Sequence, residues 1–366
     1  MSRADTPGSD APPRARTGRG DAALRADVLS ATAELERLVA EWQALLERCP
    51  WATPFQSPEW QLAWWREFGN DGLRAVAVRR AGELVGLAPF FVYGLPGEPR
   101  RLTLLADGVS DYQDVLLEPG SARAALRLVF DRIAALRGEW DVCELGELRP
   151  GSPLLAPELL AALPDGLEAT TAPLGICMSL PTPASAGALE ARLSPRFRRR
   201  LRRADEAVRA AGRAEFVMAD ADTLPELLDA LIRLHTLRWT ERGEPGVLGD
   251  PRIQRFLRAA ATGLLERGRL RLYALRLDDA PIAVLLAFSL ADRMYAYLTG
   301  LDPAAAPLHP GMLLLRHVVE DAIRAGFREV DFLRGEEEYK RSWGPVEGRS
   351  YRVVVRWDRG RGKRRA

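Results

Sequence analysis

The chain has 366 residues, of which 47% are hydrophobic and 28% are charged, a composition typical of a globular protein with room for two domains. A formal net charge of +2 indicates no overall preference for nucleic acid, and the apolar runs are too short for membrane insertion. Three cysteines without paired spacing and three histidines without a metal-ligand motif predict no disulfide and no metal site. The N-terminus lacks a signal pattern, so we predict a cytoplasmic protein.

The N-terminal part begins with a tail and two helices. Residues 1–21 combine proline, glycine and arginine without an apolar period, so we predict a disordered tail there and a basic tail over 358–366. We predict an edge strand from Leu24 to Ser30, a helix from Thr32 to Arg48 and another helix that begins at Ser57. Four aromatic residues at helical spacing follow and favour a core over a ligand platform: Trp60, Trp64, Trp65 and Phe68.

One order of elements occurs twice along the chain. Its first copy is predicted as a hairpin, two strands, a helix and a strand, at Leu73–Arg79, Leu84–Tyr93, Arg101–Leu105, Tyr112–Leu117, Ala124–Leu136 and Trp140–Leu145. The second copy has a hairpin, a third strand, a helix and a strand, at Leu270–Leu277, Pro281–Leu290, Met294–Thr299, Gly311–Ala325 and Glu329–Leu333. A shift of 197 positions places Leu73 on Leu270, which indicates an internal duplication.

This order predicts an α/β (α+β) fold of two tandem units, each a mixed, mostly antiparallel sheet flanked by helices. We place the first unit at 22–180 and the second, with the active site, at 181–357. The proline- and glycine-rich region 150–213 is predicted to connect them.

Six arginines are concentrated between Arg196 and Arg203, directly after a predicted helix start at Ser194-Pro195. Such a block can bind the phosphates of a cofactor, of a nucleotide-linked substrate or of tRNA. The alternative is a solvated helix face.

The segment from Leu308 to Trp343 concentrates polar groups around a helix, a strand and a turn. Pro310 and Gly311 begin the helix, Gly326 ends it, and Gly335 turns the chain out of the strand that follows. Glu336, Glu337 and Glu338 then fall in what we predict as the first turn of another helix. Lysine occurs only at Lys340 and Lys363, so the interior Lys340 suggests a role for a compact ammonium.

The run from Asp331 to Trp343 reads DFLRG-x-E-x-YK-x-x-W, and Tyr295–Gly300 and His309-Pro310-Gly311 precede it. Together these motifs resemble the CelD-like or FemAB-like branch of the GNAT acyltransferases, over roughly Phe55 to Trp357. The resemblance implies tandem GNAT-like domains and transfer of an acyl group from a thioester to an amine or hydroxyl. It further implies a small-molecule, sugar or peptide acceptor, in cell-envelope or polysaccharide metabolism.

The donor predicted from the resemblance is acetyl-CoA or another acyl-CoA. Its pyrophosphate would bind free N–H groups at the start of a helix, from Gly311, Met312 and Leu313, with His309 and Pro310 beside them. The wider superfamily has the loop Q/R-x-x-G-x-G/A, whereas this chain has one glycine there. FemAB-like relatives take an aminoacyl group from charged tRNA, so tRNA stays as the alternative donor.

For proton transfer we predict Tyr339 and Asp331 as the acid and base, with Glu338 competing for the base. Lys340 is assigned to a phosphate or carboxylate of donor or acceptor. A carboxylate inside a strand needs a partner, and Arg334 or Lys340 are the candidates for Asp331, which makes a structural ion pair the alternative.

The predicted acceptor pocket takes residues from two further elements and the end of the strand that holds Asp331. His235, Arg238 and Trp239 lie on an apolar helix, where a buried core histidine is the alternative. Tyr297 and Arg334 complete the predicted substrate-binding set. A tandem GNAT protein that binds ligand without catalysis is the third functional hypothesis.

Overall fold

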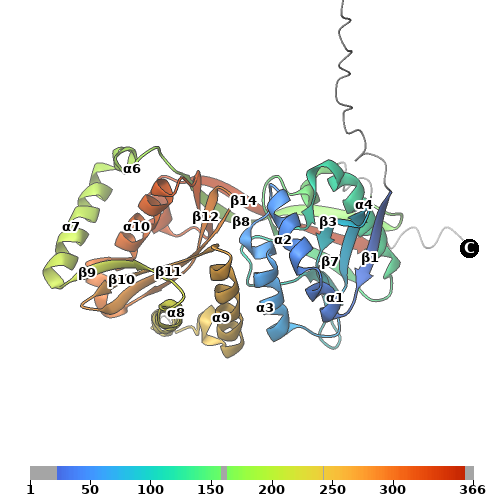
Figure 1. The fold of residues 1–366 in the computed structure, drawn as a ribbon, viewed down its shortest axis with the longest axis horizontal. Coiled ribbons are helices and arrows are strands. Elements are labelled where there is room, and N and C mark those ends of the chain that lie inside the picture. The colour runs from blue at the N-terminus through green and yellow to red at the C-terminus, as the bar shows by residue number, and fades with distance from the viewer. Residues whose placement is uncertain (1–22, 158–162, 242, 359–366) are drawn as a thin grey trace, which may run out of the picture.

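The computed structural model describes residues 23–157, 163–241 and 243–358. Within them the chain forms two lobes, joined by long strands that run from one to the other (Figure 1). The tail predicted over 1–21 and nearly all of the tail over 358–366 lie outside the described residues. In the described part, no helix combines the length and apolarity that a membrane span requires.

The N-terminal lobe contains a four-stranded sheet in the order β1-β2-β3-β6. Its strands are β1 (Leu24–Leu29), β2 (Ala75–Arg80), β3 (Glu83–Ala88) and β6 (Leu116–Leu117). Its helices are α1 (Thr32–Glu36), α2 (Val39–Arg48), α3 (Pro58–Phe68) and α4 (Ala122–Ala135), with short 3-10 turns η1 (Pro54–Gln56), η2 (Pro119–Ser121) and η3 (Pro153–Leu155). The remaining strands of this lobe are β4 (Phe90–Tyr93), β5 (Arg101–Leu104) and β7 (Val142–Leu148).

The second sheet has ten strands in the order β4-β5-β7-β14-β8-β13-β12-β11-β10-β9 and runs through both lobes. Its C-terminal strands are β8 (Leu167–Pro181), β9 (Ala214–Met218), β10 (Leu270–Leu277), β11 (Ala280–Leu290), β12 (Arg293–Leu301), β13 (Glu329–Arg334) and β14 (Val346–Trp357). The helices of this lobe are α6 (Ala186–Arg192), α7 (Pro195–Ala211), α8 (Leu224–Thr240), α9 (Pro251–Glu266), α10 (Pro310–Arg324) and α11 (Glu338–Arg341), with η4 (Val247–Gly249) and η5 (Pro303–Leu308). These mixed sheets flanked by helices confirm the predicted fold class.

Three predicted elements differ from the structure. The strand predicted over Leu84–Tyr93 is two strands in different sheets, β3 and β4, separated by Pro89, which lacks the N–H that a continuous ladder needs. The helix predicted over Thr32–Arg48 is divided into α1 and α2. Of the strand predicted over Tyr112–Leu117, only Leu116 and Leu117 form a strand, β6, and the four residues before them lie in a loop.

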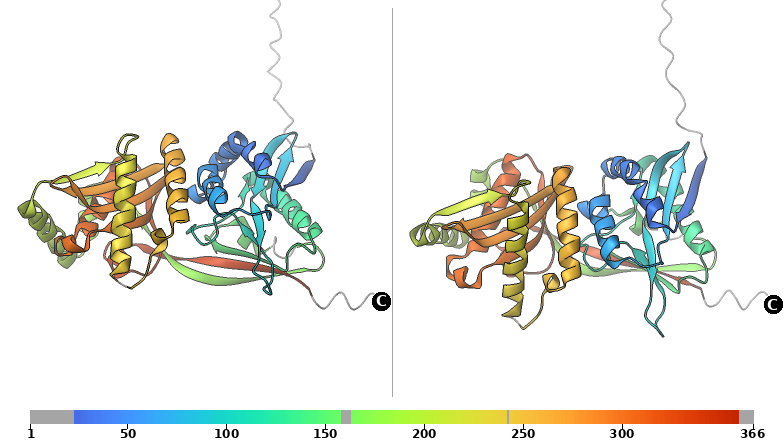
Figure 2. Two further views of the ribbon diagram at one scale, coloured as in Figure 1. Left: turned by 90° about the horizontal axis from the view of Figure 1, so that it is seen from below. Right: turned by 60° about the horizontal axis from the view of Figure 1, so that its bottom comes forward.

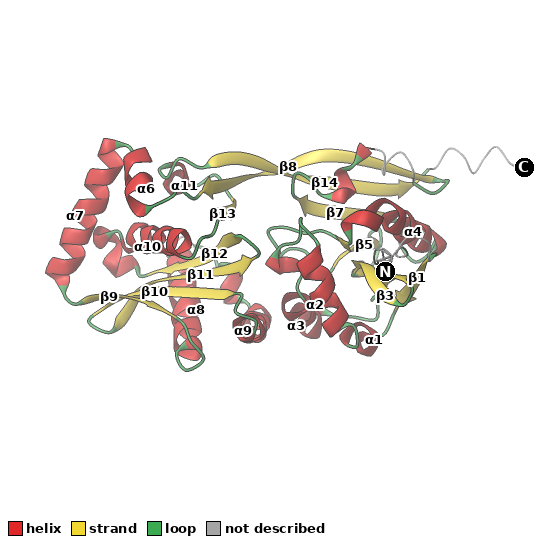
Figure 3. Ribbon diagram, turned by 45° about the horizontal axis from the view of Figure 1, so that its top comes forward, coloured by secondary structure: helices red, strands yellow, loops and turns green. Residues whose placement is uncertain are grey.

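Two long strands of the structure, β8 and β14, were not predicted from the sequence. They pair with each other over most of their length and lie across both lobes (Figure 3). One end of β8 also pairs with β13 in the C-terminal lobe, while β14 pairs with β7 in the N-terminal lobe. The division into 22–180 and 181–357 stays a prediction, and the boundary at 180 falls inside β8.

The two lobes share one hydrophobic core. Helix α3 packs against α9 where the lobes meet (Figure 2). Trp60 of α3 is fully buried, and its ring lies 4.6 Å from Phe256 of α9 and 5.4 Å from Phe288 and from Tyr297, between ring centroids. The aromatic residues of α3 are therefore core residues, as their spacing favoured.

Candidate functional site

A large opening in the C-terminal lobe lies where strands β12 and β13 separate. They pair in parallel at three positions, which end at Tyr295 opposite Asp331. Beyond that point β13 bulges, and Leu333 adopts a left-handed backbone with φ of 60°, a conformation that costs energy for this residue type. A cavity of about 830 Å³ follows, lined by the separating strands and by α7, α8, α10 and α11.

The start of α10 forms one wall of this cavity. His309 adopts a left-handed conformation with φ of 52° and Pro310 begins the helix, and both line the cavity with Gly311 and Met312. Leu313 is buried in the core and does not line it.

The backbone at this helix start differs from the prediction. The N–H groups of Met312 and Leu313 donate to the carbonyl of His309 at 3.1 and 3.4 Å, so they are not free. Within the described chain, Gly311 is the predicted donor whose N–H has no backbone acceptor. Gly311 is also required by packing, because a Cβ there would lie 2.9 Å from Leu301 Cδ2.

Tyr339 and Lys340 both line the cavity, from the short helix α11. Lys340 is buried, and its Nζ donates to the carbonyl oxygen of Arg334 at 2.5 Å and lies 2.9 Å from Glu337 Oε2. The lysine thus fixes α11 to the end of β13. Tyr339 is half-exposed, and desolvation with the nearby Glu337 carboxylate raises the pKa of its hydroxyl to about 12, so it keeps its proton at neutral pH.

The two carboxylates predicted as base lie outside the cavity lining. Asp331 is 2% exposed, and its Oδ1 accepts from the Tyr112 hydroxyl at 3.1 Å and from the Leu333 N–H at 2.8 Å. Burial raises its pKa to about 6, against the attraction of Arg149. The predicted partners, Arg334 and Lys340, were wrong, because both are held by other groups. Glu338 is exposed at the start of α11.

Arg334 instead joins the lobes. Its Nε donates to Asp111 Oδ1 at 2.7 Å, and its Nη1 donates to Glu147 Oε1 at 2.5 Å. Both carboxylates come from the N-terminal lobe, and Asp111 lines the cavity. Asp111 was not predicted as a site residue, because it directly precedes the strand predicted over Tyr112–Leu117. The acidic residues around it, Asp107, Asp111 and Asp114, were the one signal in the sequence.

Helix α8 supplies the opposite wall. His235, Arg238 and Trp239 line the cavity, so the structure brings this predicted set together. His235 is 4% exposed, and burial lowers its pKa to about 4, which keeps the ring neutral at pH 7. Its Nδ1 has no hydrogen-bond partner among the described residues. Tyr297 also lines the cavity, but its hydroxyl donates to the carbonyl of Val109 at 2.6 Å.

The arginine block lies on α7, at the outer edge of the C-terminal lobe (Figure 1). The helix buries one face, with Phe197, Leu201, Ala204 and Val208. The arginines between Arg196 and Arg203 are exposed or half-exposed, and in the described chain none has a carboxylate within 4.0 Å. Arg200 lines the cavity, so this basic face reaches its rim.

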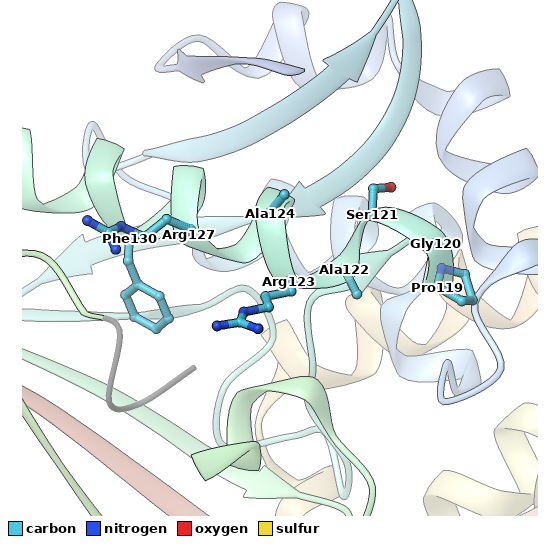
Figure 4. Close-up of a pocket in the computed structure, with 8 residues that line it drawn as sticks. All are labelled: Pro119, Gly120, Ser121, Ala122, Arg123, Ala124, Arg127 and Phe130. Atoms are coloured by element: carbon cyan, nitrogen blue, oxygen red, sulfur yellow. The ribbon is translucent and has the colours of Figure 1, made fainter. Parts of the chain in front are cut away.

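A smaller cavity of about 440 Å³ lies in the N-terminal lobe, at η2 and the start of α4 (Figure 4). Arg123 and Phe130 point to the same side of α4 there. The charged residues lining it are Arg123 and Arg127, and Arg127 is 3.3 Å from Asp131. This lining lacks an acid or base placed for proton transfer. In the described residues we find no group of three or more His, Cys, Asp or Glu that would hold a metal ion.

Comparisons with known proteins agree with this geometry. Residues 195–341 match the family model described as an acetyltransferase (GNAT) domain, whereas no curated protein matches the chain. The crystal structure of FemX has a TM-score of 0.62 at 13% identity and covers 89% of this chain and 96% of its own.

Two further solved structures are similar. A conserved protein of unknown function from Bacteroides thetaiotaomicron VPI-5482 has a TM-score of 0.60 at 13% identity, covering 90% of this chain and 99% of its own. The C-terminal domain of a putative lysylphosphatidylglycerol synthetase from Agrobacterium fabrum has a TM-score of 0.56 at 14% identity, covering 87% and 91%. Residues 195–341 therefore match a GNAT acetyltransferase domain, and the fold of the whole chain is similar to that of FemX.

Proposed function

We propose that this protein is an acyltransferase that moves an acyl group from acyl-CoA to an amine or hydroxyl acceptor. The observation that carries the proposal is the cavity of about 830 Å³ between the separated strands β12 and β13, which is lined mostly by the segment that matches the GNAT model. Its volume lies within the range of small-molecule sites. The start of α10 forms one wall and α8 with Asp111 the other, so donor and acceptor have separate ends to enter.

The donor pyrophosphate is assigned to the start of α10. The free N–H of Gly311 and the positive end of the helix dipole favour an anion there. Arg200 and His309 also line the cavity and can add donors for phosphate. This assignment uses one backbone N–H and side chains in place of a run of glycines.

The reaction requires an acid for the leaving thiolate. The acceptor attacks the thioester carbonyl, a bond from nitrogen or oxygen to carbon forms, the carbon–sulfur bond breaks, and the acceptor loses one proton. Tyr339 lines the cavity and keeps its proton at neutral pH, so it can protonate the thiolate. The roles proposed for Asp331 and Glu338 as base would need a movement or a relay, since neither lines the cavity.

The donor assignment is tested at Met312, which is half-buried at the start of α10 and lines the cavity. Met312→Glu places a negative charge beside the phosphates, whereas Met312→Gln has nearly the same size and no charge. We expect isothermal titration calorimetry to show acetyl-CoA and longer acyl-CoAs binding to the wild type and to Met312→Gln, and at least tenfold weaker binding to Met312→Glu. Equal binding to both variants would contradict the assignment.

A second candidate is aminoacyl transfer from charged tRNA. The exposed arginines of α7, which have no carboxylate partner in the described chain, favour it, and so does the fold shared with FemX. Replacing Arg196, Arg199 and Arg203 with Gln should weaken tRNA binding. It should also reduce the slope of log affinity against log salt, by about one unit for each phosphate that the protein no longer neutralises.

The matched control for this test replaces three exposed arginines of the N-terminal lobe, Arg25, Arg123 and Arg127. A reduced slope in both variants would indicate nonspecific attraction to a basic protein. Two results together would favour aminoacyl transfer from tRNA over acyl transfer from acyl-CoA. The first is that no acyl-CoA binds, and the second is that only the α7 variant reduces the slope of log tRNA affinity against log salt.

A further inference from the structure

The loop between β5 and β6, residues 105–115, belongs to the N-terminal lobe and contacts both lobes. Val109 accepts a hydrogen bond from the Tyr297 hydroxyl through its carbonyl at 2.6 Å, and Ser110 Oγ accepts from Trp60 Nε1 at 3.0 Å. Tyr112 donates to Asp331 at 3.1 Å. Irregular segments normally lie on the surface, where water satisfies their backbone groups. Here Tyr297 of the C-terminal lobe satisfies the backbone carbonyl of Val109. Trp60 and Asp331 bind the side chains of Ser110 and Tyr112, so contacts from both lobes position the loop.

That position brings Asp111 to the wall of the cavity. Its side chain is 15% exposed, which leaves an opening through which a ligand can contact the carboxylate. The residue belongs to the N-terminal lobe, while the family match and the rest of the wall belong to the C-terminal lobe. The cavity is therefore incomplete without the first half of the chain.

The charges around Asp111 do not cancel. Arg334 is shared between Asp111 and Glu147, so two carboxylates face one guanidinium and one negative charge is in surplus. The other nearby cation, Lys340, forms its ion pair with Glu337 at 2.9 Å. The second oxygen of Glu147 accepts from the Ser350 hydroxyl at 2.9 Å, which supplies a hydrogen bond but no charge. A cation from a ligand would complete this arrangement.

We propose that Asp111 binds the protonated amino group of the acceptor and selects primary amines over alcohols. This inference rests on the proposed acyltransferase function and assigns its acceptor class. Arg334 keeps its contact with Glu147 when Asp111 turns to the ligand, so the ammonium is added without leaving the arginine unpaired. An ammonium also has three donors for the carboxylate and its surroundings, whereas an alcohol has one donor and no charge. Burial raises the pKa of Asp111 against the pull of Arg334, so its carboxylate is a better acceptor for the first proton of the ammonium. The neutral amine then attacks the thioester and loses its second proton as the carbon–nitrogen bond forms, while the leaving thiolate takes a proton from Tyr339.

The test uses CoA thioethers, which cannot react. One series carries an unbranched alkyl chain of two to six carbons on sulfur, and the other carries the same chains with a terminal amino group. Calorimetry on the full chain compares the two series, because the thioether would place the chain end in the acceptor half of the cavity. We expect at least one amino-terminated thioether to bind at least tenfold more tightly than its alkyl counterpart.

Two variants test whether Asp111 causes the tighter binding of the amino-terminated thioether. Asp111→Asn keeps the shape and an acceptor for Arg334 but removes the charge, and we expect it to lose the preference for the amine while it binds the alkyl series as before. Asp107→Asn changes a half-buried acid of the same loop that does not line the cavity, and it should keep the preference.

The outcomes separate the two proposals. If neither series binds the wild type, the acyl-CoA function fails. If the alkyl series binds and no chain length favours the amine, or if Asp111→Asn keeps the preference, the role of Asp111 is wrong and the acyl-CoA function stands.

Discussion

The two lobes begin from the same local arrangement and use it differently. In each lobe two strands pair in parallel over a short stretch, β5 with β7 at two positions and β12 with β13 at three. After β12 the chain stays in its lobe and begins α10 beside the cavity of about 830 Å³. After β5 the chain forms a loop, residues 105–115, that contacts both lobes and places Asp111 in the lining of the same cavity.

The starts of helices α10 and α4 also differ between the two lobes. Helix α10 begins after a left-handed His309 and with Pro310-Gly311, where Gly311 lies against Leu301 and brings the backbone to the cavity. Helix α4 also follows a 3-10 turn, but its N-cap residue Ser121 has a φ of −124° and is not left-handed, and it lies beside the smaller cavity of about 440 Å³. The comparison indicates that the N-terminal lobe supports a site in its neighbour, through a loop and a shared core, while the lining of its own cavity, in the described residues, places no acid or base for proton transfer.

The largest effect is expected where the lobes share their core. Trp60→Ala removes a fully buried ring that contacts Phe55, Phe256 and Phe288, so it should cost about 3–5 kcal/mol of unfolding free energy. Chemical denaturation should show one transition for both lobes, shifted as a whole. Leu95→Ala, at an exposed position, is the control and should change stability by less than about 0.5 kcal/mol. Two separate transitions, with one unmoved, would show that the lobes are independent.

The next largest effect is expected at Asp331, whose carboxylate joins β13 to Tyr112 in the loop of residues 105–115. The pKa of Asp331 is raised to about 6 in the folded protein, whereas an unfolded aspartate has a pKa of about 3.9. The folded state therefore binds this proton more tightly, and the resulting stability is present below about pH 4 and lost as the pH rises through about 6. By the free energy of about 1.4 kcal/mol per pKa unit, the loss is on the order of 3 kcal/mol.

Asp331→Asn keeps an oxygen to accept from Tyr112 and Leu333 but does not titrate. We expect it to flatten the dependence of unfolding free energy on pH between pH 4 and 7, as followed by urea denaturation at several pH values. A variant with the same pH profile as the wild type would contradict a raised pKa of Asp331 in the folded protein.

The smallest effect compares the two helix starts directly. Gly311→Ala places a methyl group 2.9 Å from Leu301 Cδ2, so it should destabilise by about 1–3 kcal/mol. Gly120→Ala has no atom within 4 Å of the new methyl group and should be neutral or stabilising by up to about 1 kcal/mol. Thermal unfolding of both variants measures the difference. Adding Leu301→Ala should relieve the clash, and equal effects at the two glycines would argue against a close approach at α10.

Much of the local structure could be predicted because its signals lie within a few residues. Ser57, Ser194 and Asp250 each accept a hydrogen bond from a backbone N–H at the start of their helix. The hairpin of β10 and β11 follows from alternation around a turn. The strand β8 was missed because several consecutive residues in its middle are exposed, so it lacks the alternation of a half-buried strand, and its prolines and glycine favour a connection.

The site could be predicted in part for the same reason. Residues of the motif from His309 to Trp343, together with His235 and its neighbours on α8, do line one cavity. The hydrogen-bond partners of two motif residues lie far away in the sequence. Tyr112 donates to Asp331, and Arg334 donates to Asp111 and Glu147. No local pattern encodes such pairs, because they depend on how two lobes pack.

By itself, the sequence determined the helix starts, the hairpins, the repeated order of elements and the segment that carries the GNAT motif. These features depend on capping, turn chemistry and periodicity, which act between close neighbours in the chain. Only the tertiary structure decided that Lys340 holds the backbone of Arg334 and that Asp111 from the other lobe faces the cavity. The physical reason is that a buried charge is stable only beside an oppositely charged or hydrogen-bonding partner. Those partners are distant in the sequence, and the packing of α3 against α9 brings them together.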